Sequence, residues 1–226
     1  MDIKRQFLCG DGFHVPAVML VPPDPAGAVL IIHGYGGSKE EFMGLAWRVA
    51  EQGFATCVID LRGHGEHMLP LDENVLQDVE TAIRHCRSHG NGRDNGRVVA
   101  IGHSMGGRLA LLSSADAVIS ISPAYSQTYC EQTHTYIRRM ESHRVREQST
   151  ETVFEILQKL PLWQPGNGRR VSIIYGSRDN YDTIASCKEL ESAGVPVTLI
   201  DKALHSDSFL FEATFQVIKN ELARLF

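Results

Sequence analysis

The feature that most constrains the fold is the pentapeptide Gly-His-Ser-Met-Gly at residues 102–106, which stands between two short segments of different character. Residues 97–101 are mostly apolar and β-branched, as in a buried strand, and residues 108–112 consist largely of helix formers. A serine on so tight a turn takes strained backbone angles, and the glycine at each end of the pentapeptide leaves room for them. The pattern therefore predicts a strand, a sharp turn and a helix, with Ser104 at the apex.

Apolar runs alternate with helix-periodic segments along most of the chain. Strand-like runs occupy residues 15–21, 28–32, 54–59, 97–101, 117–121, 171–175 and 195–200. Apolar residues have helical spacing over residues 39–52, 75–86, 185–192 and 209–225. The proline cluster at residues 22–25 predicts a hairpin or a crossing at the edge of a sheet. Strands that alternate with helices are typical of a parallel sheet covered by helices on both faces.

The alternation is interrupted once, between residues 125 and 168, where no convincing strand occurs. Within this segment residues 135–147 and 152–160 have the spacing of amphipathic helices. A chain of 226 residues with 43% hydrophobic content is long enough for one substantial core and short for two. We therefore expect one α/β core, residues 1–124 and 169–226, with a small helical cap, residues 125–168, inserted after the sixth strand.

Composition argues against several classes of protein. The net charge of −5, the pI near 6.0 and the lack of a long basic run argue against a nucleic-acid partner. Residues 1–6 carry charges with no apolar region behind them, and no later apolar stretch approaches the length of a membrane span. We therefore expect a soluble, cytoplasmic protein without membrane insertion. Its five scattered cysteines, an odd number without a Cys-x-x-Cys pair, are expected to be reduced.

Two further residues give Ser104 a chemical context. A serine hydroxyl is a poor nucleophile at neutral pH, so it needs a base and a third group that orients the base. His205 lies between the last predicted strand and the last helix, and Asp179 directly follows the preceding strand. Both positions belong to the carboxyl edge of the sheet, where Ser104 also lies. Ser104, His205 and Asp179 are therefore the predicted catalytic triad, with Asp182 as the second candidate for the orienting carboxylate.

Other interpretations of the polar residues remain open. Asp179 is also compatible with a turn or a helix cap, and Asp207 is better explained as a cap in the first turn of the last helix. His103 is expected to point away from Ser104 and to pack. His64 and His67 resemble a metal-binding pair, but no third ligand lies at a useful spacing, so no metal is predicted.

Attack on a carbonyl produces an oxyanion, which needs hydrogen-bond donors aimed at it. The backbone N–H of Met105, at the start of the predicted helix, is one candidate. The other is the N–H of Tyr35, in the glycine-rich loop of residues 33–37, because glycines allow the backbone to approach a substrate closely. A glycine turn without a catalytic role is the alternative for this loop.

These residues together resemble the α/β-hydrolase superfamily, most closely small carboxylesterases and monoacylglycerol-lipase-like enzymes. Five motifs carry the resemblance in the order of the superfamily: His-Gly-x-Gly-Gly at 33–37, Asp-x-Arg-Gly-His-Gly at 60–65, Gly-His-Ser-Met-Gly-Gly at 102–107, Gly-x-x-Asp at 176–179, and His205. The resemblance implies an eight-stranded, mostly parallel sheet, a Ser-Asp-His triad, a two-donor oxyanion hole and no cofactor. It also implies that Asp60, Arg62 and His64 shape the fold near the site and are not catalytic.

The cap is the part of the chain that departs from better-known relatives, because it is short and polar. Its first predicted helix carries five basic residues: Arg138, Arg139, His143, Arg144 and Arg146. We interpret them as a solvated face of the helix. The alternative is that they attract an anionic group of the substrate. A long acyl chain is therefore not favoured. The candidate pocket residues are Tyr129, Tyr136, Met140 and Trp163, although side chains at this spacing also simply pack a cap on its core.

The function expected from the sequence is hydrolysis of carboxylic esters with small to medium acyl groups, through a Ser-His-Asp triad and an acyl-enzyme. The partner would be a small-molecule ester, and the oligomeric state is left open. The same constellation serves thioesterases and amide hydrolases, because the leaving group is recognised by the pocket. From a different class, a non-catalytic binding protein on a hydrolase scaffold is the remaining alternative.

Overall fold

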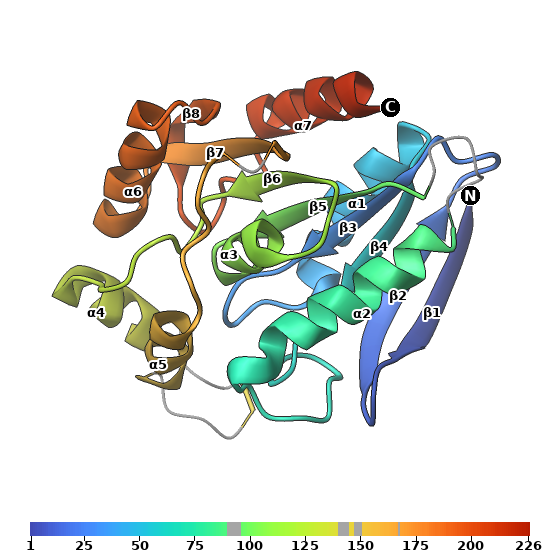
Figure 1. Cartoon of the computed structure of the whole chain (residues 1–226), viewed down its shortest axis with the longest axis horizontal. Helices are drawn as coiled ribbons and strands as arrows, with labels where there is room; N and C mark the ends of the chain where they lie inside the picture. Colours follow the sequence, from blue (N-terminus) through green and yellow to red (C-terminus); the bar gives the residue numbers. More distant parts are fainter. Residues whose placement is uncertain (90–95, 140–144, 147–150, 167) are drawn as a thin grey trace.

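The computed structural model describes residues 1–89, 96–139, 145–146, 151–166 and 168–226. One eight-stranded sheet in the order β1-β2-β4-β3-β5-β6-β7-β8 forms its centre (Figure 1). β2 is antiparallel to both of its neighbours, and all other neighbouring strands are parallel. The strands are β1 (Asp2–Cys9), β2 (His14–Val21), β3 (Ala28–Ile32), β4 (Ala55–Ile59), β5 (Val98–His103), β6 (Ala117–Ile121), β7 (Arg170–Arg178) and β8 (Val197–Leu204).

Helices cover both faces of this sheet, as the fold class predicted from the sequence requires. The helices are α1 (Met43–Glu51), α2 (Leu76–Arg87), α3 (Met105–Leu112), α4 (Glu131–Arg139), α5 (Glu151–Lys159), α6 (Tyr181–Ser192) and α7 (Glu212–Leu225). Short 3₁₀ turns at Lys39–Phe42 and Glu73–Val75 lead into α1 and α2. The prediction of a mostly parallel, eight-stranded α/β-hydrolase sheet is therefore confirmed.

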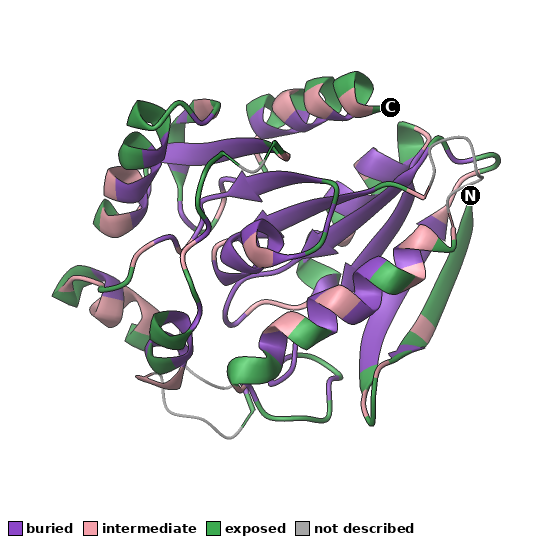
Figure 2. Ribbon diagram, viewed as in Figure 1, coloured by how far each residue is buried: buried purple, intermediate pink, exposed green. Residues whose placement is uncertain are grey.

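Each face of the sheet has its own hydrophobic cluster, because successive strand residues point to opposite sides. In β3, Leu30 and Ile32 belong to the cluster that includes residues of α2, α3 and α6, whereas Val29 and Ile31 belong to the cluster of α1 and α7. Figure 2 shows the central strands as buried along their length. Burial on both faces explains why these strands are nearly continuous apolar runs in the sequence.

The largest difference from the sequence-based prediction is β1, which no predicted element covers. Most of its residues are exposed, and polar side chains interrupt its apolar residues, so no hydrophobic run marks it. β1 and β2 form the edge hairpin. The proline cluster at residues 22–25 belongs to a crossing, because β4 lies between β2 and β3.

Several predicted boundaries are wrong by a few residues in the last third of the chain. α6 begins at Tyr181, where the apolar spacing predicted Ala185, because Tyr181 and Asp182 in its first turn are polar or exposed. β8 begins later than predicted and extends to Leu204 as a half-exposed edge strand. α7 begins at Glu212, after a series of turns that the pattern had included in the helix.

The cap segment lies between β6 and β7 and packs directly on the core. Val153 and Leu157 of α5 belong to the same hydrophobic cluster as the strands beneath them. The predicted helix over residues 135–147 is wrong at both ends: α4 begins at Glu131, and Val145 forms a bridge with His64. Met140, His143 and Arg144 lie outside the described residues. The division into core and cap remains a prediction.

The buried guanidinium of Arg108 connects the core to the cap segment through hydrogen bonds. The side chain of Arg108 on α3 has no exposed surface, and it donates hydrogen bonds to the backbone oxygens of Ala124, Ser126 and Leu160, at 3.2, 2.8 and 2.6 Å. These acceptors lie directly before the cap segment, at its start and near its end. Within the described ranges, no helix has the length and apolar character needed to cross a membrane.

Candidate active site

Ser104 occupies the sharp turn between β5 and α3, with φ of 54° and ψ of −117°. Such angles are rare for a residue with a side chain, so the surrounding structure has to enforce them. An added Cβ at Gly102 would collide with the backbone of Gly106, and one at Gly106 would collide with the carbonyl of His33. The glycines at both ends of the turn are therefore required by close backbone approach, as the sequence pattern predicted.

The structure brings Ser104, His205 and Asp179 together from three separate loops. His205 Nε2 lies 2.9 Å from Ser104 Oγ, and His205 Nδ1 lies 2.6 Å from Asp179 Oδ1. A carboxylate oxygen only accepts hydrogen bonds, so Nδ1 carries the proton and Nε2 is free to accept the hydrogen of the serine hydroxyl. This is the tautomer that a general base at this position requires.

The Asp179 carboxylate is held by more than His205. Its Oδ2 accepts a hydrogen bond from Ser122 Oγ at 2.6 Å, and its Oδ1 accepts one from the Asn180 N–H at 2.8 Å. Burial raises the pKa of Asp179, but the hydrogen bonds with His205 and Ser122 outweigh it, so the pKa lies below its ordinary value. Asp179 is therefore ionised at neutral pH.

Ser122 is a site residue that the sequence analysis does not include. It directly follows β6, with a positive φ of 47°, and its Oγ also lies 2.8 Å from Ser208 Oγ. Its position at the carboxyl edge of β6, beside β7, is the only signal in the sequence that points to it. A serine after a strand is too common for that signal to stand alone.

The two alternative carboxylates have other partners. Asp182 Oδ2 accepts hydrogen bonds from the Cys130 N–H at 3.0 Å and from Thr133 Oγ1 at 2.6 Å, so it holds α4 against α6. Asp207 Oδ1 accepts from the Leu204 N–H at 2.7 Å. The prediction that Asp207 caps the last helix is wrong, because α7 begins only at Glu212.

His103 contacts the backbone of His205 rather than Ser104 Oγ. Its Nε2 lies 2.8 Å from the backbone oxygen of His205, which can only accept, so Nε2 carries the proton. Burial, with the neighbouring His205, lowers the pKa of His103 to about 3. Phe42 and Phe209 flank its ring. His103 is thus a neutral side chain that positions the backbone of His205.

The loop of residues 33–37 lies directly against Ser104. An added Cβ at Gly34 would lie 2.9 Å from Ser104 Cβ, and both Tyr35 and Met105 line a cavity together with Ser104. The N–H groups of Gly36 and Gly37 are engaged, with His64 Nε2 at 3.0 Å and with the Gly34 oxygen at 3.1 Å. The loop thus lies close enough to Ser104 to take part in the site, and the role of the Tyr35 N–H as an oxyanion donor stays a prediction.

The loop of residues 60–65 holds the loop of residues 33–37 in place. His64 donates from Nδ1 to the Arg62 oxygen at 3.0 Å and accepts the Gly36 N–H, so both ring nitrogens are used. Burial, with the neighbouring His33, lowers the pKa of His64 to about 3. Asp60 and Arg62 are buried in ion pairs with Lys39 and Asp78. Within the described ranges, no group of three possible metal ligands occurs.

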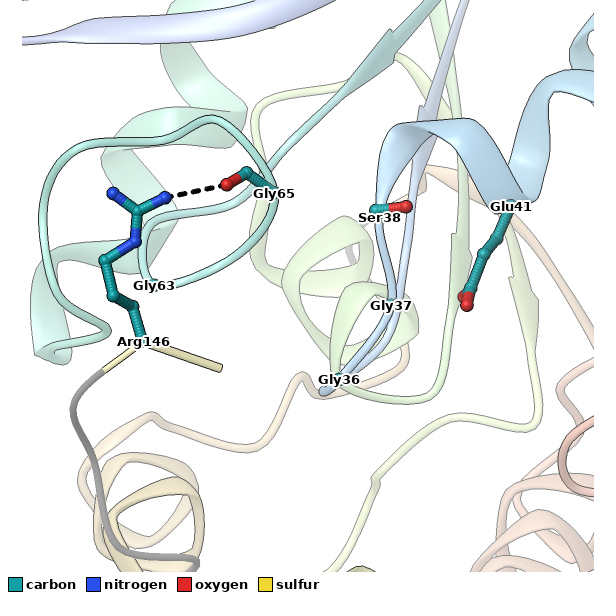
Figure 3. A pocket seen from close by; sticks show the side chains of 7 residues that line it. All are labelled: Gly36, Gly37, Ser38, Glu41, Gly63, Gly65 and Arg146. Atoms are coloured by element: carbon teal, nitrogen blue, oxygen red, sulfur yellow. Dashed lines mark hydrogen bonds between the residues drawn. The ribbon is translucent and has the colours of Figure 1, made fainter. Parts of the chain in front are cut away.

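The middle of the cap segment, at Val145 and Arg146, contacts the same loops. Val145 pairs with His64, and the N–H of Arg146 donates to the Gly63 oxygen at 2.8 Å. The Arg146 guanidinium also donates to the Gly65 oxygen at 2.8 Å, over a cavity of about 350 Å³ (Figure 3). Glu41 lies on the other side of this cavity, with Gly36 and Gly37 between them. Arg138 pairs with Glu131 and Glu151 on the exposed face of the cap.

Two cavities meet at Ser104. An open cleft of about 380 Å³ is lined by Tyr136, Phe209 and Leu210, and a smaller cavity of about 30 Å³ is lined by Tyr129 and residues of α5. Of the predicted pocket residues, Tyr136 thus lines the cleft and Tyr129 the small cavity. Trp163 lines neither; it is buried in the core, and its backbone oxygen accepts a hydrogen bond from Tyr125. Met140 lies outside the described residues.

The sheet, the strained turn between β5 and α3 and the position of Ser104 on that turn are those of the α/β-hydrolase fold. Comparison with known proteins agrees with this fold, and the chain resembles proteins of the α/β-hydrolase superfamily. Residues 23–133 match the model of a family described as serine aminopeptidase, S33.

A curated relative and several solved structures share this fold. The chain is 28% identical over 127 residues to the sn-1-specific diacylglycerol lipase ABHD11 of Danio rerio, covering 52% of this chain and 38% of that protein. A carboxylesterase structure from Nitrososphaera gargenis has a TM-score of 0.73 at 16% identity and covers 97% of this chain and 98% of its own. An esterase from Pyrobaculum calidifontis has a TM-score of 0.67 at 18% identity, covering 99% and 84%. At identities this low, the likeness to these two solved structures shows the fold alone.

Proposed function

We propose that the chain is a serine esterase that hydrolyses carboxylic esters through an acyl-enzyme. The observation that carries the proposal is the continuous hydrogen-bonded series from Asp179 through His205 to Ser104, with distances of 2.6 and 2.9 Å. The esterase names of similar structures, including those from Nitrososphaera gargenis and Pyrobaculum calidifontis, support the choice of an ester substrate. A small-molecule ester fits the cleft beside Ser104, and a cytoplasmic location remains part of the proposal.

The proposed reaction has two steps. Ser104 Oγ attacks the ester carbonyl while His205 Nε2 takes the hydroxyl proton, and the N–H groups of Tyr35 and Met105 hold the oxyanion. The bond from the carbonyl carbon to the alcohol oxygen then breaks, and His205 gives its proton to the departing alcohol. Water attacks the acyl-enzyme with His205 again as base, which releases the acid and restores Ser104. Asp179 stabilises the protonated form of His205.

Removal of the Ser104 hydroxyl tests this proposal directly. The Ser104→Ala variant should lose turnover of p-nitrophenyl acetate by on the order of 10⁴-fold or more, because the triad acts as a unit. A fluorophosphonate probe should label the wild-type protein at Ser104 and leave the variant unlabelled. Ser113→Ala is the matched control, since the Ser113 hydroxyl bonds to nearby backbone, donating to the Ala110 oxygen and accepting the Ala115 N–H, and not to the triad. Retained activity in Ser104→Ala would refute the assignment, and an unlabelled wild-type protein would favour a binding protein.

The second candidate is hydrolysis of an amide or a thioester at the same site. The family model that matches residues 23–133 is described as serine aminopeptidase, and this description favours an amide as a second candidate substrate. Matched acetyl ester, thioester and anilide substrates separate the three activities by their relative kcat/KM. We expect the ester to be cleaved fastest, and a faster anilide would replace the esterase proposal with an amidase.

A further inference from the structure

Ser104 stands between two cavities of very different size. The small cavity of about 30 Å³ and the open cleft of about 380 Å³ share Ser104, His205 and Tyr35 as lining residues. When the carbonyl carbon of an ester bonds to Ser104 Oγ, it still carries the acyl chain and the alcohol oxygen, and the two cavities offer two directions for these two groups. Each direction suits one half of an ester, either the acyl group or the alcohol.

The small cavity lies under the cap, and the α5 residues on its wall are apolar and buried, whereas Thr133, Asn180, Asp182 and Thr183 line other parts of it. Val153, Phe154 and Leu157 of α5 are 2%, 4% and 3% exposed. Phe154 stacks on His134 with 3.8 Å between ring centroids, and the Tyr129 hydroxyl donates to the Ala124 oxygen at 3.0 Å. A volume of this size has room for about two groups as large as a water molecule or a methyl. A longer group would have to displace the wall.

The cleft, in contrast, opens outward and continues beyond the site. Gly36, Gly37 and Glu41 line both the cleft and the cavity of about 350 Å³ shown in Figure 3. Leu210, on the far wall of the cleft, is 64% exposed, so this wall borders solvent. A large group has room here without any displacement of the protein.

The order of the chemical steps decides which half of the ester takes which cavity. The alcohol has to leave, and water has to enter, while the acyl group is still bonded to Ser104 Oγ. An alcohol enclosed in the small cavity would be trapped beside the acyl-enzyme and would attack it again, which reverses the first step. An acyl group is not restricted in this way, because it departs only after water has released it as the acid.

On the basis of the proposed esterase function, we infer that the small cavity under the cap takes the acyl group and the open cleft takes the alcohol. The substrate class is esters of short acids, acetate to propionate, with bulky or extended alcohols. Leu157, at the wall of the small cavity, sets the limit on acyl length. The bond that forms joins Ser104 Oγ to the acyl carbon, the bond that breaks frees the alcohol, and His205 transfers the proton between them.

Two substrate series test the inference on the wild-type protein. In the first, p-nitrophenyl esters increase from acetate to octanoate, and kcat/KM should fall at least tenfold between propionate and hexanoate. In the second, the acyl group stays acetyl and the alcohol increases from phenyl to naphthyl and larger, and kcat/KM should remain within about threefold or increase. A kcat/KM that rises with acyl length, or falls tenfold with alcohol size, would overturn the assignment.

A pair of cap variants tests the role of Leu157. Leu157→Ala enlarges the small cavity and should raise the hexanoate-to-acetate ratio of kcat/KM at least tenfold. Leu160→Ala is the matched control, since it removes the same atoms from a buried leucine that does not line the cavity, and its ratio should stay at the wild-type value. If Leu157→Ala fails to fold, Val153→Ala provides the same comparison with a smaller loss of volume.

The outcomes separate this inference from the function on which it rests. If no ester of either series is turned over, the esterase proposal and the inference both fail. If short and long esters are turned over equally, or if Leu157→Ala and Leu160→Ala change the ratio alike, the esterase proposal stands and the inference alone is refuted.

Discussion

At the scale of single residues, the site depends on side chains whose partners determine their roles. Asp179 and Asp182 are only three positions apart in the sequence, and either is a plausible orienting carboxylate there. In the structure, Asp179 contacts His205 at 2.6 Å and Asp182 contacts Thr133 at 2.6 Å. The two carboxylates therefore have separate functions that substitution can distinguish.

The Asp179→Asn variant should lose about 10³- to 10⁴-fold in kcat, because an amide N–H₂ facing His205 favours the wrong tautomer of the imidazole. Asp182→Asn should leave kcat within a few-fold of wild type, since its partners are Thr133 on α4 and Cys130 directly before that helix, and not His205. Steady-state kinetics with p-nitrophenyl acetate measures both. The reverse ranking would move the orienting role to Asp182.

Ser122 supports the charge of Asp179, and its removal should change the pH dependence of the reaction. Without the hydrogen bond from Ser122 Oγ, the pKa of Asp179 rises, so protonation begins at a higher pH. In Ser122→Ala, the acidic limb of the pH profile of kcat/KM should therefore shift upward, with a rate loss of about tenfold. Ser208→Ala is the control, because the Ser208 hydroxyl contacts Ser122 Oγ and the backbone oxygen of His205 but not the Asp179 carboxylate. An unshifted profile in Ser122→Ala would remove Ser122 from the site.

The sequence predicts residues well where chain order alone determines their place. Ser104, Asp179 and His205 follow β5, β7 and β8 at the same edge of the sheet, so their convergence follows from the parallel topology. Ser122 and the anchoring role of Asp182 depend on contacts between segments that are distant in sequence, with partners 57 and 52 positions apart. No local pattern encodes such contacts.

At the scale of elements, buried strands and helices were predictable, and the exposed ones were not. β5 has all six residues buried, and its apolar run marks it clearly. β1 is mostly exposed, and it is held by backbone pairing with β2 over its whole length. Hydrophobic periodicity in a sequence indicates which residues are buried. It therefore does not predict an exposed strand that is stabilised mainly by backbone hydrogen bonds.

The contact between α3 and the cap depends on Arg108, and its loss should destabilise the protein. Arg108→Met would leave three carbonyl groups without their charged donor, at a cost on the order of 3 kcal/mol. Urea unfolding followed by circular dichroism measures the loss. Arg84→Met, on the exposed side of α2, should stay within about 0.5 kcal/mol of wild type. Equal midpoints for the two variants would contradict the anchoring role.

At the scale of the whole molecule, buried neutral histidines link stability to pH. Burial is the largest cause that lowers the pKa of His33 to about 4, and of His64 and His103 to about 3. In the unfolded chain each titrates near pH 6.5. Below that pH the unfolded state binds protons that the folded state does not, so the folded protein loses stability as the pH falls.

The melting temperature should therefore be constant at pH values above about 7 and should fall clearly between pH 6.5 and pH 5. Each of the three histidines contributes about 1.4 kcal/mol per pH unit in this window, as an order-of-magnitude estimate. Differential scanning calorimetry at several pH values gives the curve, and buffers of different ionisation enthalpy give the protons taken up on unfolding. A melting temperature that is the same at pH 7 and pH 5 would show that these side chains are not neutral and buried together.

The bridge between Val145 and His64 has a consequence for redesign of the enzyme. Val145 touches His64, His64 accepts the Gly36 N–H, and Gly36 belongs to the loop that faces Ser104. The cap segment and the loop of residues 33–37 are thus joined by direct contacts, so under the proposed function a displacement of the cap segment should also displace this loop. Variants in which the cap moves outward to admit a larger acid should then position the proposed oxyanion donors less well. Broader substrate range and fast turnover therefore oppose each other in this scaffold, and a directed-evolution experiment that selects for one should find the other declining.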